Sequence, residues 1–263
     1  MKPLEYENHT KPFIEAFEEW KTFGNECSLE DLRIIVPLMR TYFHCPKAAK
    51  RRYTPLHHAI RIGDLEFIRL MHLLQIEFGT LDRHNRNLFH IACLTEKNQI
   101  EVLKLLLEYS KEKNLDVNHS DGTCAPLHQA CTLGQIDVVK LLLTSESIDV
   151  NALDINGKHP LHHACKSNRA DIVKVLLSSK EIILTPVGYF GMPTGMTLLH
   201  FVCLTGSIEI VELLLDATDE LEVVLNAKNS RGKTPMEVAK ESRHFAIVKL
   251  LKQRSLMLKT KCL

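Results

Sequence analysis

Apolar residues recur along this chain in short segments that have the spacing of an amphipathic α-helix. Three clear segments are 136–143, 172–177 and 208–215, where isoleucine, valine and leucine recur at i, i+3 and i+4. That spacing gathers the apolar side chains on one helical face. A shorter apolar segment precedes each of them, and a glycine or asparagine separates the two. The pattern therefore predicts pairs of short helices, each too small to bury its apolar face alone.

The shorter segments share a motif that is best preserved in Ala125–Cys131 (APLHQAC). Related tetrapeptides stand at Thr54–His57, Asn87–His90, His159–His162, Thr197–His200 and Thr234–Glu237. The histidine position falls at 57, 90, 128, 162, 200 and 237, at intervals of 33 to 38 residues. Threonine or asparagine at the first position can begin a helix, and proline is tolerated in the first turn. Each copy is therefore expected to begin a first helix.

A residue suited to ending a helix follows each copy of the motif. These residues are Gly63, Asn98, Gly134, Asn168, Gly206 and Arg243. Glycine and asparagine enter the left-handed backbone conformation at the lowest cost, so five of the six fit a C-terminal cap.

A repeat of about 33 residues built on T-P-L-H-x-A is the signature of ankyrin repeats. Over residues 48–255 the chain resembles an ankyrin-repeat protein, in six registered copies. The resemblance implies an all-α fold, a solenoid of about six stacked helix pairs that share one elongated core. The last copy, with Glu237 in place of histidine and many lysines after it, is expected to be a C-terminal cap.

Residues 1–47 lack the motif and are predicted to form a divergent helical N-terminal cap. Phe13, Phe17 and Trp20 lie on one face of a predicted helix, and Ser28 with Asp31 resembles a capping box that opens a second. The alternative is an arm of two helices that binds a partner. Residues 256–263 are interpreted as a basic tail.

Two repeats depart from the pattern. In the second, the first helix is expected to end in a longer tip at residues 94–97, and the second helix to run on through Lys113. In the fifth, the usual connection is replaced by residues 183–193, which carry no charge and include Tyr189 and Phe190. Insertions in solenoids often lie on the binding face, so these aromatics are candidate contacts; packing against the core is the alternative.

Composition narrows the class of protein. Lysine plus arginine number 33 against 32 acids, so no overall field favours nucleic acid. No apolar stretch approaches the ~18 residues of a membrane helix, and the first thirty residues contain no secretory signal. Four of the eight cysteines lie in repeat register, which favours reduced thiols. We expect a cytoplasmic protein, monomeric by itself; the basic residues 47–52 leave the nucleus as an alternative.

Four His-x-x-Cys pairs raise the question of chemistry: His90/Cys93, His128/Cys131, His162/Cys165 and His200/Cys203. Zinc needs its donors within ~2.0–2.3 Å, whereas equivalent atoms of stacked repeats lie ~8–10 Å apart. A buried thiol has a raised pKa, unlike a nucleophile. The resemblance implies structural histidines that bridge loop and helix. We therefore expect no enzyme activity, no metal and no cofactor.

The resemblance implies a non-enzymatic module that binds another protein through its concave face and turn tips, as scaffold, adaptor or inhibitor. The alternatives are an effector that bacteria deliver into host cells, or a recognition module for an enzyme located elsewhere. By motif position the candidate contacts are Arg61, Ile62, Arg83, Arg86, Leu94, Thr95, Thr132, Leu133, Ile155, Asn156, Lys158, Lys166, Ser167, Met196, Leu204 and Thr205. Apolar and basic residues alternate among them, so an acidic partner segment with apolar anchors would fit.

One asparagine is a candidate for modification. Ankyrin repeats are substrates of an asparaginyl hydroxylase that favours a leucine eight residues before its target, and an acid and an apolar residue just before it. Asn151 has Leu143, Asp149 and Val150 at these positions. The alternative is that Asn151 only makes the hydrogen bonds of a turn.

Overall fold

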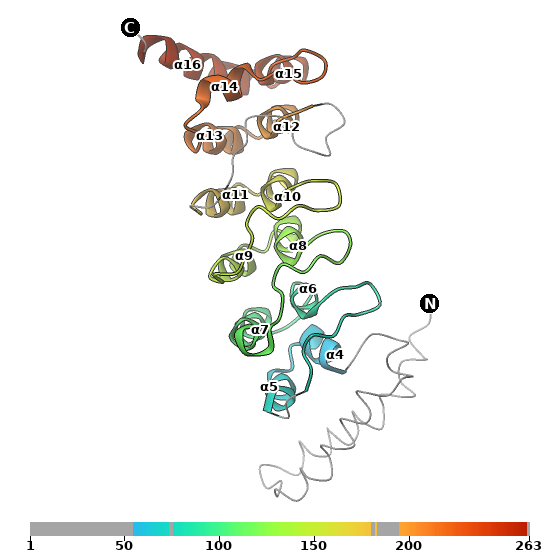
Figure 1. Cartoon of the computed structure of the whole chain (residues 1–263). Helices are drawn as coiled ribbons and strands as arrows, with labels where there is room; N and C mark the ends of the chain where they lie inside the picture. Colours follow the sequence, from blue (N-terminus) through green and yellow to red (C-terminus); the bar gives the residue numbers. More distant parts are fainter. Residues whose placement is uncertain (1–54, 74–75, 180–181, 183–194, 262–263) are drawn as a thin grey trace, which may run out of the picture.

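The computed structural model describes residues 55–73, 76–179, 182 and 195–261. These residues form helices and loops and no strand, and six helix pairs stack side by side (Figure 1). The pairs are α4 (Pro55–Ile62) and α5 (Leu65–Leu73), α6 (Leu88–Ala92) and α7 (Gln99–Lys113), α8 (Pro126–Leu133) and α9 (Ile136–Leu142), α10 (Pro160–Lys166) and α11 (Ala170–Leu177), α12 (Leu198–Thr205) and α13 (Ile208–Asp216), and α15 (Pro235–Glu241) and α16 (Phe245–Lys261). The predicted all-α solenoid is confirmed. The predicted N-terminal cap and the 183–193 segment lie outside the described residues.

The pairs form two layers. The first helix of every pair lies in one layer and the second helix in the other, and the loops that join successive repeats extend beyond the first-helix layer (Figure 1). Between the layers runs one continuous core of leucine, isoleucine and valine, with the small residues after each motif histidine fully buried. Ala92, Ala130, Ala164 and Ala239 are 0 % exposed, which is what close approach of neighbouring helices requires.

Two of the first helices, α12 and α15, begin with a reciprocal cap made by the motif itself. In α12 the Thr197 hydroxyl accepts a hydrogen bond from the backbone N–H of His200, and Nδ1 of His200 accepts from the backbone N–H of Thr197 at 3.2 Å. In α15 the Glu237 carboxylate accepts from the backbone N–H of Thr234 at 2.7 Å instead. Glutamate therefore replaces histidine in the last repeat without loss of the cap.

All six predicted helix ends adopt the left-handed conformation. Gly134 has φ 72° and Asn168 has φ 52°, as the residue types favour. Arg243 has φ 62°, although this conformation costs a residue with a Cβ roughly 1–2 kcal/mol. The repeat register, more than the residue itself, therefore fixes the turn in the last repeat.

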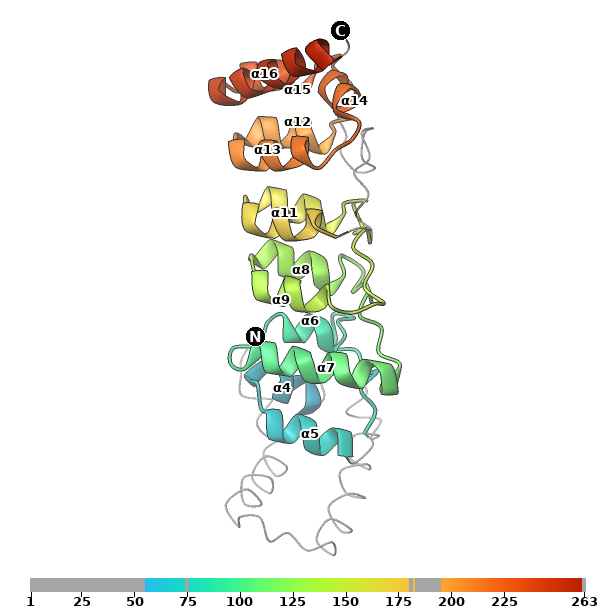
Figure 2. The same cartoon turned by 90° about the vertical axis from the view of Figure 1, so that its left-hand side faces the viewer.

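Helix α7 has 15 residues, against 7 to 9 in α5, α9, α11 and α13. Figure 2 shows it reaching past its neighbours in the stack. The extension is held by aromatic rings: Tyr109 stacks on His72 with 3.6 Å between ring centroids and meets Phe78 edge-on. Tyr109 is buried, so the extra turns pack against the first repeat. The predicted run-on through Lys113 is confirmed.

The sixth helix pair carries polar residues at positions that are buried in the preceding repeat. Glu237, Lys240 and Lys252 occupy the places of His200, Cys203 and Leu215, and all three are exposed where their counterparts are buried. These substitutions give the outer face of this pair a polar surface.

Two features of this end differ from the sequence analysis. Helix α14 (Leu221–Asn226), which packs against α15 and α16, was not predicted. Helix α16 continues to Lys261, so it includes most of the segment that was set apart as a basic tail.

Candidate partner-binding surface

The predicted contacts lie at the ends of first helices and in the loops beside them, on one side of the solenoid. Their apolar members are open to solvent: Ile62 and Leu94 are 38 % exposed, and Leu133 and Leu204 are 48 % exposed. Ile155, in the loop before α10, is 71 % exposed. Three of the first helices (α4, α8 and α12) and two loops thus present leucine or isoleucine to water, whereas α10 presents Lys166. We call the exposed residues Ile62, Leu94, Leu133, Ile155, Lys166 and Leu204 the first-helix surface.

Two predicted contacts have structural roles instead. Thr95 is buried, and its hydroxyl donates to the carbonyl of Ile60 in the preceding repeat at 2.9 Å. Arg86 donates from Nε and Nη2 to one oxygen of Asp82, at 2.9 and 2.7 Å, and Asp82 is fully buried. Truncating Arg86 would leave the buried carboxylate of Asp82 without its ion-pair partner, so the charge of Arg86 stabilises the loop. We withdraw both residues from the contact surface.

The remaining candidates differ in how exposed their side chains are. Arg83, Asn156, Lys166 and Thr205 are exposed, while Lys158, Ser167 and Met196 are half-buried. Arg61 is exposed and lies 3.9 Å from the carboxylate of Glu96, a weak surface pair. Tyr189 and Phe190 lie outside the described residues.

A hydrogen-bonded chain of three side chains crosses from the third repeat to the fourth. The ring of His163 lies 2.8 Å by Nδ1 from the hydroxyl of Thr132, and 3.0 Å by Nε2 from Oδ2 of Asp154. The order resembles that of a nucleophile, base and acid. The Thr132 hydroxyl has a single proton and also lies 2.9 Å from the carbonyl of His128, so two acceptors compete for that proton. The chain ties the third repeat to the fourth at the surface.

Asp154 is the fixed end of this chain. Burial disfavours its charge, but hydrogen bonds from the backbone N–H of Lys158 and from His163 outweigh burial, and the pKa of Asp154 lies below its usual value. A negative carboxylate thus anchors His163 and, through it, Thr132. The hydrogen bonds of His163 to Thr132 and Asp154 were not predicted from the repeat motif. The only signal in the sequence was the second histidine at position 163, next to the motif histidine at 162.

Three of the motif histidines, His90, His128 and His200, link their repeat to the next. Nε2 of His90 donates to the carbonyl of Cys124 at 3.0 Å, that of His128 to Lys158 at 3.0 Å, and that of His200 to Lys233 at 2.9 Å. Burial lowers the pKa of His128 to about 4, so the ring is neutral at pH 7. The structural interpretation of these histidines is confirmed.

The cysteines of the motif are poor nucleophiles. Burial raises the pKa of both Cys93 and Cys203 to about 12. Cys131 and Cys165 are also buried, with their pKa values raised by burial. Within the described ranges no group of three or more His, Cys, Asp or Glu residues could hold a metal ion.

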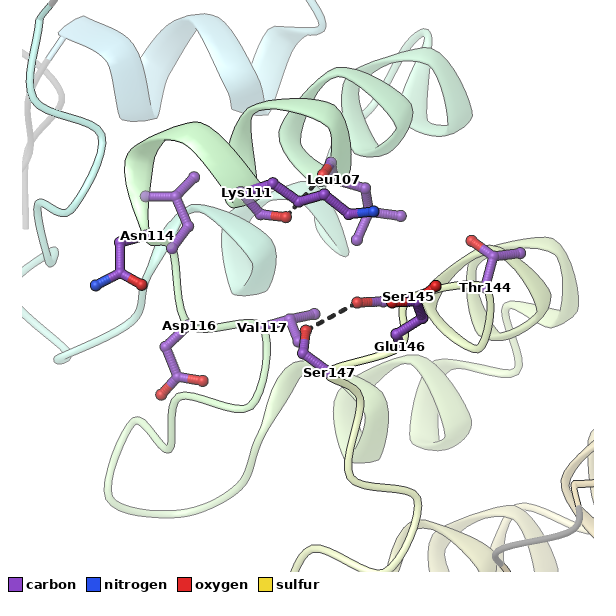
Figure 3. Close-up of a pocket in the computed structure, with 11 residues that line it drawn as sticks. Leu107, Lys111, Asn114, Asp116, Val117, Thr144, Ser145, Glu146 and Ser147 are labelled. Carbon is purple, nitrogen blue, oxygen red and sulfur yellow. Dashed lines mark hydrogen bonds between the residues drawn. The ribbon is translucent and has the colours of Figure 1, made fainter.

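A hollow of about 570 Å³ lies between the extended end of α7 and the loop after α9 (Figure 3). Leu107 and Lys111 of α7 face Thr144 and the Ser145–Ser147 hydroxyl pair across it. None of the predicted contacts lines it. The hollow follows from the extra length of α7 and belongs to the second-helix layer.

Comparison with known families decides what the repeats are. A family profile described as "Ankyrin repeats (3 copies)" matches residues 27–121, 110–186 and 183–260, which together span most of the chain. The chain belongs to the ankyrin-repeat family. The first match begins at residue 27, inside the segment predicted as an N-terminal cap. Ankyrin repeats generally mediate binding between proteins.

Curated relatives carry similar ankyrin segments within much longer proteins. The chain is 28 % identical to the nuclear factor NF-kappa-B p110 subunit of Drosophila melanogaster over 194 residues, 73 % of this chain and 20 % of that protein. It is 27 % identical over 197 residues to the transient receptor potential cation channel subfamily A member 1 of the same fly, 73 % of this chain and 16 % of that protein. The B-cell lymphoma 3 protein homolog of Mus musculus is 34 % identical over 106 residues, 40 % of this chain and 23 % of that protein.

The chain thus spans less than a quarter of each of these relatives. In the described part of this ankyrin-repeat chain, no helix is long and apolar enough to cross a bilayer.

Proposed function

We propose that this ankyrin-repeat chain binds a protein partner across its first-helix surface and loop tips, as a non-enzymatic scaffold, adaptor or inhibitor. The observation that carries the proposal is the set of exposed apolar side chains at Ile62, Leu94, Leu133, Leu204 and Ile155. Apolar side chains aligned on one side of a soluble solenoid are a common feature of binding faces. The length of the relatives also supports a recognition module that works beside an activity located elsewhere.

The chemistry of the surface favours an acidic partner segment with apolar anchors. Arg83 and Lys166 are exposed near the apolar residues, and the loop residue Asn156 can hydrogen-bond to a main chain. Tyr189 and Phe190 remain proposed contacts beside this surface. We place the protein in the cytoplasm, with the nucleus as the alternative compartment, and expect a monomer in the absence of its partner.

Charged substitutions on the first-helix surface test this function. Leu133→Glu with Leu204→Glu is expected to weaken partner binding at least tenfold, or about 1.4 kcal/mol, because it places carboxylates where an acidic segment packs. Binding is measured by quantitative affinity purification from cell lysate, with mass spectrometry of the captured proteins. Leu73→Glu is the matched control, since Leu73 is 74 % exposed but lies in the second-helix layer. Capture of the same proteins by all three forms would contradict the proposal.

Modification of Asn151 is a separate proposal. The backbone N–H of Asn151 donates to Asp149 at 2.9 Å, and its carbonyl accepts from His159 at 2.5 Å, so the residue lies in an ordered turn. Incubation with an asparaginyl hydroxylase is expected to add one oxygen to the peptide that contains Asn151. Asn118 serves as control because Ser110 stands where the leucine is wanted. Absence of the added oxygen on the Asn151 peptide would leave this residue with a turn function only.

A further inference from the structure

Positive charge is concentrated in the last repeat, whereas the chain as a whole is nearly neutral. Residues 228–261 contain ten lysines and arginines and two acids, although the net charge of the whole chain is +1. The segment just before it, 207–227, contains six acids and no basic residue: Glu209, Glu212, Asp216, Asp219, Glu220 and Glu222. A basic end therefore adjoins an acidic surface on α13 and α14.

The two acids of the last repeat are already engaged within it. Glu241 pairs with Lys233, and Glu237 caps α15. Arg254 pairs with Asp216 of α13. Six further cations of this repeat are exposed and form no ion pair with any described residue: Lys228, Arg231, Lys240, Arg243, Lys249 and Lys252.

Two of these lysines lie in a straight row with exposed apolar residues on α16. Phe245, Lys249, Lys252 and Leu256 stand at i, i+4, i+7 and i+11, which is one face of the helix. Phe245 is 70 % exposed and Leu256 is 63 % exposed, while Ile247, Val248 and Leu251, which lie outside this row, are buried in the core. We call this row the α16 stripe; it is about 16 Å long.

The repeat pattern does not account for the α16 stripe. A polar outer face on this repeat would need only polar residues such as Lys240 and Lys252, and no exposed aromatic residue. Ile208, the counterpart of Phe245 in the preceding repeat, is 41 % exposed, so the larger aromatic residue stands further into solvent than an ordinary repeat would place it. An aromatic and an aliphatic side chain that flank two unpaired lysines have the composition of a contact surface.

We propose that the α16 stripe binds an acidic helical segment of another protein. Its apolar ends would each take an aliphatic or aromatic residue of the partner, and Lys249 and Lys252 would pair with carboxylates between them. A row at i, i+4, i+7 and i+11 is the seam along which two helices pack, so a partner helix of three turns matches its length. This contact lies on a second helix, apart from the first-helix surface.

Neighbouring charges argue against other anionic ligands. Helix α13 lies beneath α16 and α14 lies near one end of it (Figure 2), and the acids of both would repel an extended polyanion such as duplex DNA or an anionic membrane. A membrane-binding helix must also offer a continuous apolar face, and that face of α16 is buried in the core. A short acidic helix avoids both conflicts.

Selection from a displayed library of random peptides of about 16 residues tests the proposal. Peptides are selected on the full chain and counter-selected on Lys249→Glu with Lys252→Glu. We expect the enriched peptides to carry acids between two apolar residues at helical spacing. In fluorescence anisotropy they should bind Phe245→Ala with Leu256→Ala at least tenfold more weakly, and should weaken as salt rises from about 50 to 300 mM.

The matched control is Lys140→Glu with Lys174→Glu, the same change of charge on the second helices α9 and α11; its peptide affinity should equal that of the unmodified chain. Melting temperatures establish that each variant is folded. Failure to enrich any peptide, or enrichment of peptides without acids, would overturn the proposal. So would binding to phosphatidylserine vesicles or duplex DNA, or dimerisation in sedimentation, if Lys249→Glu with Lys252→Glu abolished it.

Discussion

Gly63→Ala is expected to cost more than 3 kcal/mol of folding free energy, the largest effect of any single methyl group added to this chain. Gly63 has φ 76°, a conformation that costs an L-residue roughly 1–2 kcal/mol. A Cβ there would lie 1.9 Å from the carbonyl oxygen of Lys97 in the next repeat. The Lys97 carbonyl is part of the backbone and cannot rotate away. The next residue, Asn98, fixes this segment against the first repeat, because its side-chain amide donates to the carbonyl of Gly63 at 3.0 Å. Relief therefore requires the contact between the first two repeats to open.

Two other glycines separate backbone strain from crowding. Gly122 has φ 95° with nothing within 4 Å of an added Cβ, so Gly122→Ala should cost only the roughly 1–2 kcal/mol of the conformation. At Gly134 the added Cβ would meet Nη1 of Arg169 at 2.1 Å, the far end of a flexible side chain that can move. Gly134→Val adds branching and should destabilise more than Gly134→Ala. Urea unfolding of the series measures the order; equal losses at positions 63 and 122 would refute the crowding argument.

Acid is expected to destabilise the solenoid as soon as pH falls below about 6.5, before most carboxylates protonate. Burial lowers the pKa of His57 and His128 to about 4 and that of His162 to about 3. The unfolded chain binds a proton on each histidine near pH 6.5, whereas the folded chain does not, so stability falls as pH drops through this window. From pH 7 to 5 each such histidine should cost about 2 kcal/mol.

Thermal melting from pH 7.5 to 4 measures this loss, with His128→Gln as the test variant. Glutamine offers an acceptor and a donor but does not titrate, so His128→Gln should be less stable at pH 7.5 and should depend less on pH, by about one proton. His84→Gln is the control, since His84 is exposed in a loop. A melting temperature that stayed constant from pH 7.5 to 5 would contradict the burial argument.

The helix pairs and their ends were predictable because their chemistry is local. Glycine and asparagine enter the left-handed conformation at low cost, and T-P-L-H caps a helix within four residues. Arg243 shows where this reasoning fails: nothing in arginine favours φ 62°, and only its place in the repeat supplies the reason. Helix α14 has apolar residues at 221, 224 and 225, but six residues are too few for a periodic signal to stand out.

The contact surface was less predictable because exposure depends on residues far away in sequence. Thr95 has the motif position of a surface residue, yet it is buried, and its hydroxyl donates to the carbonyl of Ile60, 35 residues before it. Arg86 has the chemistry of a contact, yet Asp82 occupies its guanidinium. The α16 stripe was hidden in what was interpreted as a capping repeat with a basic tail, because a lysine-rich helix end also suits the helix dipole.

The hydrogen bonds from the motif histidines give the stack a direction. Three of them reach forward, from His90 to Cys124, from His128 to Lys158 and from His200 to Lys233, so these repeats are tied to the loop that follows them. Removing the repeat that holds the histidine would free a carbonyl, which water can satisfy. Removing the repeat that holds the carbonyl would expose the imidazole N–H, which can also donate to water. Either deletion loses one net hydrogen bond of about 0.5–1.5 kcal/mol, so the apolar contacts between helix pairs, more than these bonds, hold the stack together.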